Sequence, residues 1–205
     1  MPGTYTVKMT RGKESYSTPL VIGLDPRAKY SVEDRKLEFD AAMRAYNLLA
    51  DMSFDVDRIN GVHDALLDRA GKWKGSEAFA NRLKELARKT EEMRKKIVAT
   101  KEGGAVTGEE RIREKTTQLY GDILNYEGRP ADYQVARIES LKRELEDVAA
   151  DFDALVAKEF PAVNKSLVQK KLEAIQPVTR KAWDAAGGAA EVGGAARGNF
   201  SEEHE

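Results

Sequence analysis

The sequence predicts a mainly α-helical protein, in which an antiparallel, coiled-coil-like bundle of four helices follows a short β-hairpin. Near the start of the chain, two short stretches alternate apolar and polar residues, a pattern typical of strands. Between residues 31 and 173, apolar residues recur at helical spacing in successive segments, as expected for packed helices. Residues 174–205 are rich in glycine and alanine and lack such a stripe, which predicts a disordered tail.

The predicted hairpin spans residues 1–27. Its strands cover Thr4–Met9 and Tyr16–Leu24, and Gly12 supplies a turn between them. Pro19 favours a strand at the edge of a sheet. A lone hairpin is marginally stable in water, so either the helices cover its apolar face or the rest of a sheet is missing. We expect this face to consist of Tyr5, Val7, Leu20 and Ile22.

The first helix is expected to begin after Ser31, a residue suited to accept a hydrogen bond from an unpaired helix amide. It should continue for about forty residues, which corresponds to roughly 60 Å. Its apolar positions alternate steps of four and three residues, the heptad pattern of a coiled-coil seam. This predicted seam consists of Met52, Val56, Ile59, His63, Leu66, Ala70 and Trp73.

Three more helices complete the predicted bundle. Ser76 is the expected N-cap of the second helix, and the glycine-rich segment 101–108 predicts a loop before the third. Because proline interrupts helices, we expect a separate short helix over residues 163–172, after Pro161. The apolar stripes of the three helices occupy residues 79–97, 112–126 and 138–155.

The composition argues against several classes of protein. The chain has 205 residues and no cysteine, so it forms neither a disulfide scaffold nor a thiolate zinc site. Its 34 basic and 35 acidic residues give a net charge of −1, which argues against a nucleic-acid partner. No segment predicts a membrane span, and residues 1–20 lack the pattern of a signal peptide.

Few residues are candidates for chemistry. His63 lies on the predicted seam, where an imidazole could act as a base or a metal ligand, but the other histidine, His204, is near the terminus. Asp51 and Asp55 are one helical turn apart and, with Asp57, could bind a divalent cation. The simpler interpretation is a core histidine and a solvated acidic face, and the same holds for Asp151 and Asp153.

Residues 187–198 contain several glycines, as phosphate-binding loops do. Such a loop needs a preceding strand, a following helix and, in nucleoside triphosphatases, a Gly-Lys-Ser/Thr sequence. None of these features is present, and low complexity explains the segment better. We therefore expect no catalytic residue, no cofactor and no metal in this chain.

Two stretches near the N-terminus resemble a known architecture. They are Pro2-Gly-Thr-Tyr-Thr-Val-Lys-Met9 and Tyr16-Ser-Thr-Pro-Leu-Val-Ile-Gly-Leu-Asp-Pro-Arg27. They are similar to the last strands of an immunoglobulin- or fibronectin-like sandwich in large bacterial β-propeller proteins with BNR (Asp-box) repeats, the sortilin-like and glycosyl-hydrolase-like group. The segments 38–49 and 152–164 fit the helical module that follows there.

The resemblance implies that this chain is the C-terminal piece of a longer exported protein, periplasmic or secreted. The propellers of that group are sialidase- or glycosidase-like, and their catalytic groups would lie on the propeller. This sequence contains no Asp-box, so no such residue carries over to it.

Three functions compete on this evidence. The first is a non-catalytic module that packs on the sandwich and propeller of its parent through Tyr5, Val7 and Ile22. The second is a self-standing interaction module that binds a partner helix or forms a homodimer. The third is an enzyme or metal protein built on His63 and the aspartates of residues 51–57. The second would use seam positions of the first helix, namely Ile59, His63 and Leu66.

Overall fold

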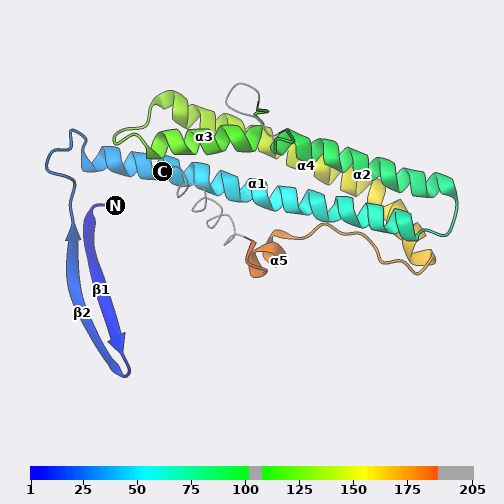
Figure 1. Cartoon of the computed structure of the whole chain (residues 1–205), viewed down its shortest axis with the longest axis horizontal. Helices are drawn as coiled ribbons and strands as arrows, with labels where there is room; N and C mark the ends of the chain where they lie inside the picture. The colour runs from blue at the N-terminus through cyan, green and yellow to red at the C-terminus, as the bar shows by residue number, and fades with distance from the viewer. Residues whose placement is uncertain (102–107, 189–205) are drawn as a thin grey trace, which may run out of the picture.

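The computed structural model describes residues 1–101 and 108–188 (Figure 1). It confirms a mainly α-helical protein, with an N-terminal two-stranded antiparallel hairpin followed by long packed helices. The elements are β1 (Gly3–Arg11), β2 (Glu14–Ile22), α1 (Val32–Lys72), α2 (Glu77–Ile97), α3 (Ile112–Leu124), α4 (Asp132–Gln169) and α5 (Arg180–Ala185).

The helices are arranged differently from four parallel rods. α2 and α3 follow each other along α1 and return antiparallel to it, as Figure 1 shows. α4 then runs parallel to α1, because the ion pairs Arg44–Glu139 and Arg58–Asp153 both join residues 95 positions apart. The bundle therefore has three helical rows along most of its length. One of these rows consists of α2 followed by α3. The two helices are roughly 32 and 20 Å long, so that together they extend along most of α1.

The core side of α1 differs from the predicted seam at two positions. Met52, Ile59 and Leu66 are buried as expected. Asp55 and Val62 are buried as well, in place of their neighbours Val56 and His63, which are only partly buried. A helix that packs against two other rows buries a wider stripe than a helix in a two-stranded coiled coil. Residues next to the predicted seam positions can therefore be buried in the core.

The predicted starts of the first two helices are confirmed, with different caps. The Ser31 hydroxyl accepts a hydrogen bond from the Asp34 amide at 3.1 Å, and the Asp34 carboxylate accepts one from the Ser31 amide at 2.9 Å. The Ser31 amide holds the pKa of Asp34 below its usual value, and the Ser31 hydroxyl, which donates to the same carboxylate oxygen at 2.8 Å, adds to the effect. Ser76 begins α2 through its backbone carbonyl, which accepts from Phe79 at 3.2 Å, without a side-chain cap.

The predicted break at Pro161 is wrong, because α4 continues through this residue to Gln169. Proline inside a helix costs about 3 kcal/mol. Beside it, Phe160, Val163 and Leu167 are at most 3% exposed. Burying three such side chains contributes roughly 5–9 kcal/mol, which outweighs the cost of the proline and keeps the helix continuous.

α4 ends in a Schellman motif that contains a non-glycine residue. Lys171 has φ = 59°, and the Leu172 amide donates to the Leu167 carbonyl at 3.0 Å. The left-handed conformation costs an L-residue about 1–2 kcal/mol.

Lys171→Gly is therefore expected to raise the free energy of unfolding by about 0.5–1 kcal/mol, after the entropy that glycine gains in the unfolded chain. Urea denaturation measures this change. Lys170→Gly is the matched control, because Lys170 has φ = −101° and glycine should lower stability there. A loss of stability in both variants would contradict the prediction.

The chain after α4 packs against the bundle, contrary to the disordered tail predicted from residue 174. Asn164 holds Ile175 by two hydrogen bonds, accepting from its amide at 2.8 Å and donating to its carbonyl at 2.9 Å. Ile175 and Trp183 are 2% and 6% exposed.

Tyr126 also differs from the prediction, since it is 61% exposed instead of lying on the stripe of α3. The central part of the predicted loop at residues 101–108 lies outside the described residues. Among the described helices, none is both long and apolar enough to cross a membrane.

Candidate functional site

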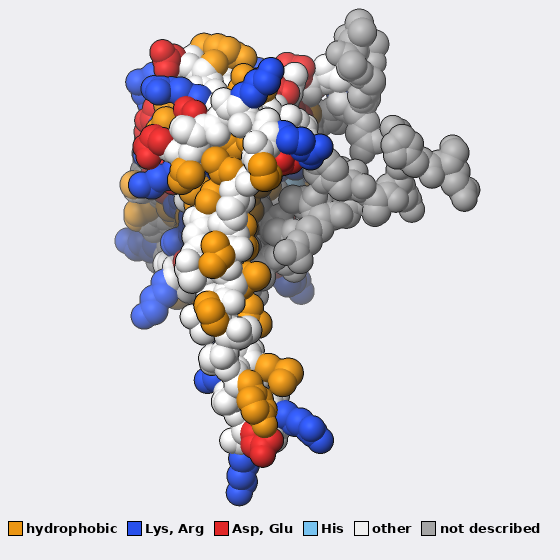
Figure 2. Space-filling view, turned by 90° about the vertical axis from the view of Figure 1, so that its left-hand side faces the viewer, with side chains coloured by type: hydrophobic (Ala, Val, Ile, Leu, Met, Phe, Trp, Pro, Cys, Tyr) orange, Lys and Arg blue, Asp and Glu red, His pale blue; other side chains and the backbone are white. Residues whose placement is uncertain are grey.

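The hairpin exposes an apolar face along its whole length. Its strands pair in register, with Tyr5 opposite Leu20 and Met9 opposite Tyr16, and every residue of both strands is exposed. Gly12 has φ = 59°, as a tight two-residue turn beginning with glycine requires. Figure 2 shows hydrophobic side chains running down the hairpin. The side chains on this face, which we call the apolar hairpin face, belong to Tyr5, Val7, Met9, Tyr16, Leu20 and Ile22.

The sequence left open whether the helices cover this face or whether the rest of a sheet is missing. In the structure the helices do not cover it. The hairpin projects from the end of the bundle at which α1 begins (Figure 1). Each of the six side chains is between 42% and 59% exposed. Three of them, Tyr5, Val7 and Ile22, are among the interaction residues predicted from the sequence, whereas Met9 and Tyr16 complete the face by their pairing.

The end of the bundle next to the hairpin is also rich in exposed apolar side chains. Among the described residues, the exposed large hydrophobic side chains lie on the hairpin or at this end, apart from Leu67, Val168 and Val178. The exposed apolar surface is therefore concentrated at one pole of the molecule. The side chains at this end of the bundle belong to Val32, Phe39, Met43, Leu124, Tyr126 and Tyr133.

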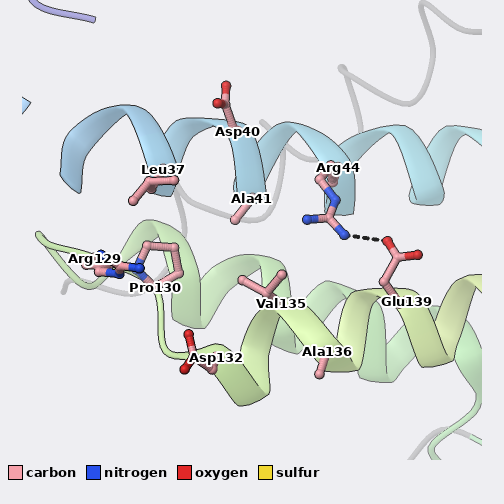
Figure 3. A pocket seen from close by; sticks show the side chains of 10 residues that line it. All are labelled: Leu37, Asp40, Ala41, Arg44, Arg129, Pro130, Asp132, Val135, Ala136 and Glu139. Atoms are coloured by element: carbon pink, nitrogen blue, oxygen red, sulfur yellow. Dashed lines mark hydrogen bonds and ion pairs between the residues drawn. The ribbon is translucent and has the colours of Figure 1, made fainter. Parts of the chain in front are cut away.

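A cavity of about 600 Å³ opens at the same pole, between the first turns of α1 and α4 (Figure 3). Ala41, Val135 and Ala136 contribute apolar lining, and an ion pair between Arg44 and Glu139 crosses it. Its remaining charged residues are of both signs. This mixture gives the cavity no preference for an anion or a cation.

The predicted seam candidates do not form a common surface. Ile59 and Leu66 are 1% and 0% exposed and belong to the core. His63 is half-buried on the flank of α1, where its Nδ1 lies 2.9 Å from a carboxylate oxygen of Asp64. No group of three or more potential metal ligands occurs in residues 1–101 and 108–188.

The acidic residues of α1 contact the C-terminal segment. The Asp51 carboxylate accepts a hydrogen bond from Arg180 at 2.7 Å, and the Asp57 carboxylate accepts one from the Trp183 indole at 2.7 Å. Asp55 pairs with Arg58 at 3.3 Å. Each of the three aspartates therefore has its own protein donor, and Asp51 and Asp57 hold α5 on α1.

Guanidinium groups and aromatic rings alternate at this contact, which we call the C-terminal clasp. Arg58 lies 5.2 Å from the ring centres of both Phe152 and Phe54. Arg180 lies 5.1 Å from Phe54 and 5.3 Å from Trp183. Cation–π contacts contribute about 0.5–2 kcal/mol each, more when desolvated, so the stack anchors the segment to α1 and α4.

The other two predicted candidates also have pairing roles. Asp153 binds Arg58, and Asp151 accepts from Lys96 on α2 at 3.1 Å. Phe54 and Arg180 were not predicted from the sequence, because neither lies on an apolar stripe. Trp183 was a detectable signal, as a large aromatic in a segment with few others. Of the glycine-rich stretch 187–198, all but the first two residues lies outside the described residues.

Burial of Asp55 has a consequence for the pH dependence of stability. Desolvation raises the pKa of the Asp55 carboxyl, opposed by the charge of Arg58 and its hydrogen bond. A carboxyl whose pKa is higher in the folded state stabilises the fold below its usual pKa and loses that contribution as pH rises through the folded value. The free energy of unfolding of Asp55→Asn, relative to that of the wild type, should therefore increase as the pH rises from 3 to 7. Urea denaturation at each pH measures this difference.

Asp68→Asn provides the control of opposite sign. The Lys72 ammonium lowers the pKa of Asp68, with Arg69 adding to the effect. The stabilising contribution of the Asp68 carboxylate is present above the usual aspartate pKa and is lost as pH falls. The free energy of unfolding of Asp68→Asn, relative to that of the wild type, should therefore decrease as the pH rises from 3 to 7. If this relative stability changed in the same direction with pH in both variants, the opposite pKa shifts of Asp55 and Asp68 would be contradicted.

Comparison of the chain with family models, with curated proteins and with solved structures finds no match in any of the three.

Proposed function

We propose that this chain is a non-catalytic packing module, in which the helical bundle supports a hairpin whose apolar face is covered by a β-sheet from outside these 205 residues. The observation that supports this function is the exposure of the apolar hairpin face within the chain itself. Apolar surface is stabilised by about 25 cal/mol per Å² when it is removed from water. Contiguous exposed patches of this kind mark interaction surfaces.

The distribution of apolar surface favours one partner that reaches beyond the hairpin. The bundle exposes Phe39, Tyr126 and Tyr133 at the same pole, with 46%, 61% and 73% exposure. A partner that covers the hairpin and also reaches this end of the bundle would remove these side chains from water as well.

The resemblance of the N-terminal segments to the end of a sandwich agrees with this function. On that basis the partner would be the sandwich and β-propeller of a longer bacterial protein, periplasmic or secreted and glycosidase- or sialidase-like, with this chain as its C-terminal module. Any catalytic groups would then lie on the propeller.

The alternative, dimerisation through spare positions of the long helix, has less support. Two of its three candidate residues, Ile59 and Leu66, are enclosed by the chain's own helices. A homodimer through them would require the bundle to open. The third candidate, His63, is partly buried and by itself would provide only a small contact with a second copy.

Hydroxyl-radical footprinting tests the proposed function. The protein is isolated from its natural source without denaturation, and oxidation of Tyr5, Met9 and Tyr16 is compared with that in the isolated 205-residue chain. We expect oxidation of these side chains to fall at least about fivefold in the native assembly, because burial removes them from solvent. Leu67 is the internal control and should be oxidised equally in both samples. It is 44% exposed and lies near the C-terminal end of α1, whereas the hairpin adjoins the N-terminal end of this helix.

Equal oxidation of the hairpin in the two samples would contradict the packing function. Protection together with a native mass equal to two copies of the chain would identify the homodimer instead.

A further inference from the structure

The two outer edges of the hairpin differ in their hydrogen-bonding capacity. In an antiparallel pair, residues that exchange both backbone hydrogen bonds alternate with residues whose N–H and C=O groups point away from the partner strand. A two-residue turn closes on a hydrogen-bonded pair, which here is Arg11 and Glu14. Counting back from this pair, Thr6 and Pro19 face each other as a pair with outward-pointing backbone groups.

This alternation defines which groups each edge presents. The outward groups of β1 belong to Thr4, Thr6, Lys8 and Thr10, all of which carry an N–H. Those of β2 belong to Ser15, Ser17, Pro19 and Val21. Proline has no N–H to donate, so the edge of β2 lacks a donor in its middle, as is typical of a strand at the outside of a sheet. The edge of β1 is complete.

We propose that the partner adds a β-strand to the outer edge of β1, which leaves β2 as the outermost strand of the combined sheet. This inference rests on the proposed function and specifies its partner: a β-sheet with an unpaired edge strand and an apolar inner face. The added strand satisfies the backbone groups of β1, as in other cases of β-strand addition. The partner's core then covers the apolar hairpin face.

The side chains on β1 agree with this direction of growth. Tyr5, Val7 and Met9 lie on the apolar face, whereas the residues with outward backbone groups carry polar side chains on the opposite face. An added strand with the same alternation would extend both faces without placing a polar side chain in the core.

A second copy of the chain is a less suitable partner. Two copies paired edge to edge through β1 would leave both apolar faces in water. Two copies stacked face to face would leave both β1 edges unpaired. Even complete coverage of the six half-exposed side chains on each copy, at about 100 Å² per side chain, buries roughly 1,200 Å² over the two copies, the lower limit for specific interfaces. A larger sheet satisfies the edge and the face together.

Hydrogen exchange resolved to single amides tests the proposal, using the native assembly and the isolated chain. The outward amides of Thr6 and Lys8 should exchange at least about tenfold more slowly in the assembly, because each becomes hydrogen-bonded. The outward amide of Ser17 on β2 should exchange at the same rate in both samples.

The failure of this inference can be distinguished from the failure of the proposed function. Fast exchange at Thr6 and Lys8 with protected side chains on the apolar hairpin face would show a partner that covers the face without adding a strand to β1. Protection at Ser17 instead would place the partner on β2. Either result overturns the inference and leaves the packing function intact. Unprotected amides together with unprotected side chains would overturn both.

A matched pair of proline variants provides an independent test. Thr6→Pro and Ser17→Pro each remove one outward N–H and leave the hydrogen bonds between β1 and β2 in place. We expect Thr6→Pro to reduce the amount of native assembly at least about tenfold and Ser17→Pro to leave it unchanged. Exchange at the inward amides of Val7 and Thr18 reports whether the hairpin remains formed. With a formed hairpin, equal assembly of both variants would overturn the proposal.

Discussion

Leu66→Lys is expected to abolish cooperative folding of the bundle. Leu66 is 0% exposed and lies in the core between α1 and its neighbouring helices. Loss of a buried leucine costs about 3–5 kcal/mol, and burial of an unpaired ammonium costs several kcal/mol more. Because single domains have a total stability of about 5–15 kcal/mol, the folded state should be lost or left marginal, as measured by circular dichroism during urea titration.

Leu67→Lys is the matched control for this variant. Leu67 is the next residue of α1 and is 44% exposed, so a lysine there should change the free energy of unfolding by less than about 0.5 kcal/mol. Equal stability of the two variants would contradict the orientation of α1. The pair also bears on dimerisation, since a lysine at Leu66 would remove any association by unfolding the chain and not by blocking a surface.

The sequence was sufficient to predict the elements that depend on local signals. The alternation in β1, the N-cap at Ser31 and the apolar stripe of α2 each depend on residues within a few positions of one another. Local hydrogen bonds and periodicity indicate such features without information on distant segments. The hairpin, the start of α1 and the buried face of α2 were therefore predictable from the sequence.

The features that the sequence analysis missed depend on contacts between distant segments. Pro161 is tolerated because its neighbours are buried by other helices, and local propensity yields to such packing. Asp55 replaces Val56 in the core because Arg58, which also binds Asp153 on α4, provides a partner for its charge. Periodicity measures apolar character along one helix and contains no information on partners from another.

The candidate surfaces were predictable to different degrees. The apolar hairpin face was predictable because its residues belong to two adjacent strands with a short turn. The C-terminal clasp was not, because Arg180 lies 129 positions after Asp51 and Trp183 lies 126 positions after Asp57. A single Arg-x-x-Trp sequence in an alanine-rich segment carries no signal about where it binds.

Trp183→Ala is expected to release the segment that follows α4. Trp183 is 6% exposed, packs edge-on against Phe54 with ring centres 5.6 Å apart, and donates to Asp57. Truncation of a buried tryptophan costs about 3–5 kcal/mol. Because α5 is only six residues long, it has little helical stability without this contact. Amides of residues 180–186 should then exchange at least about 100-fold faster, while those in the middle of α1 keep their protection.

Val178→Ala separates loss of the clasp from a general loosening of the segment. Val178 lies in the same segment but is 37% exposed, so its truncation should change exchange in residues 180–186 by less than about threefold. Fluorescence provides a second measurement, because the chain has two tryptophans and Trp73→Phe leaves Trp183 as the only one. In that background Arg180→Ala removes the guanidinium between Phe54 and Trp183, and the emission of Trp183 should shift to longer wavelength as the indole meets water. An unchanged emission together with unchanged exchange in Trp183→Ala would show that Asn164 and Ile175 hold the segment without the aromatic stack.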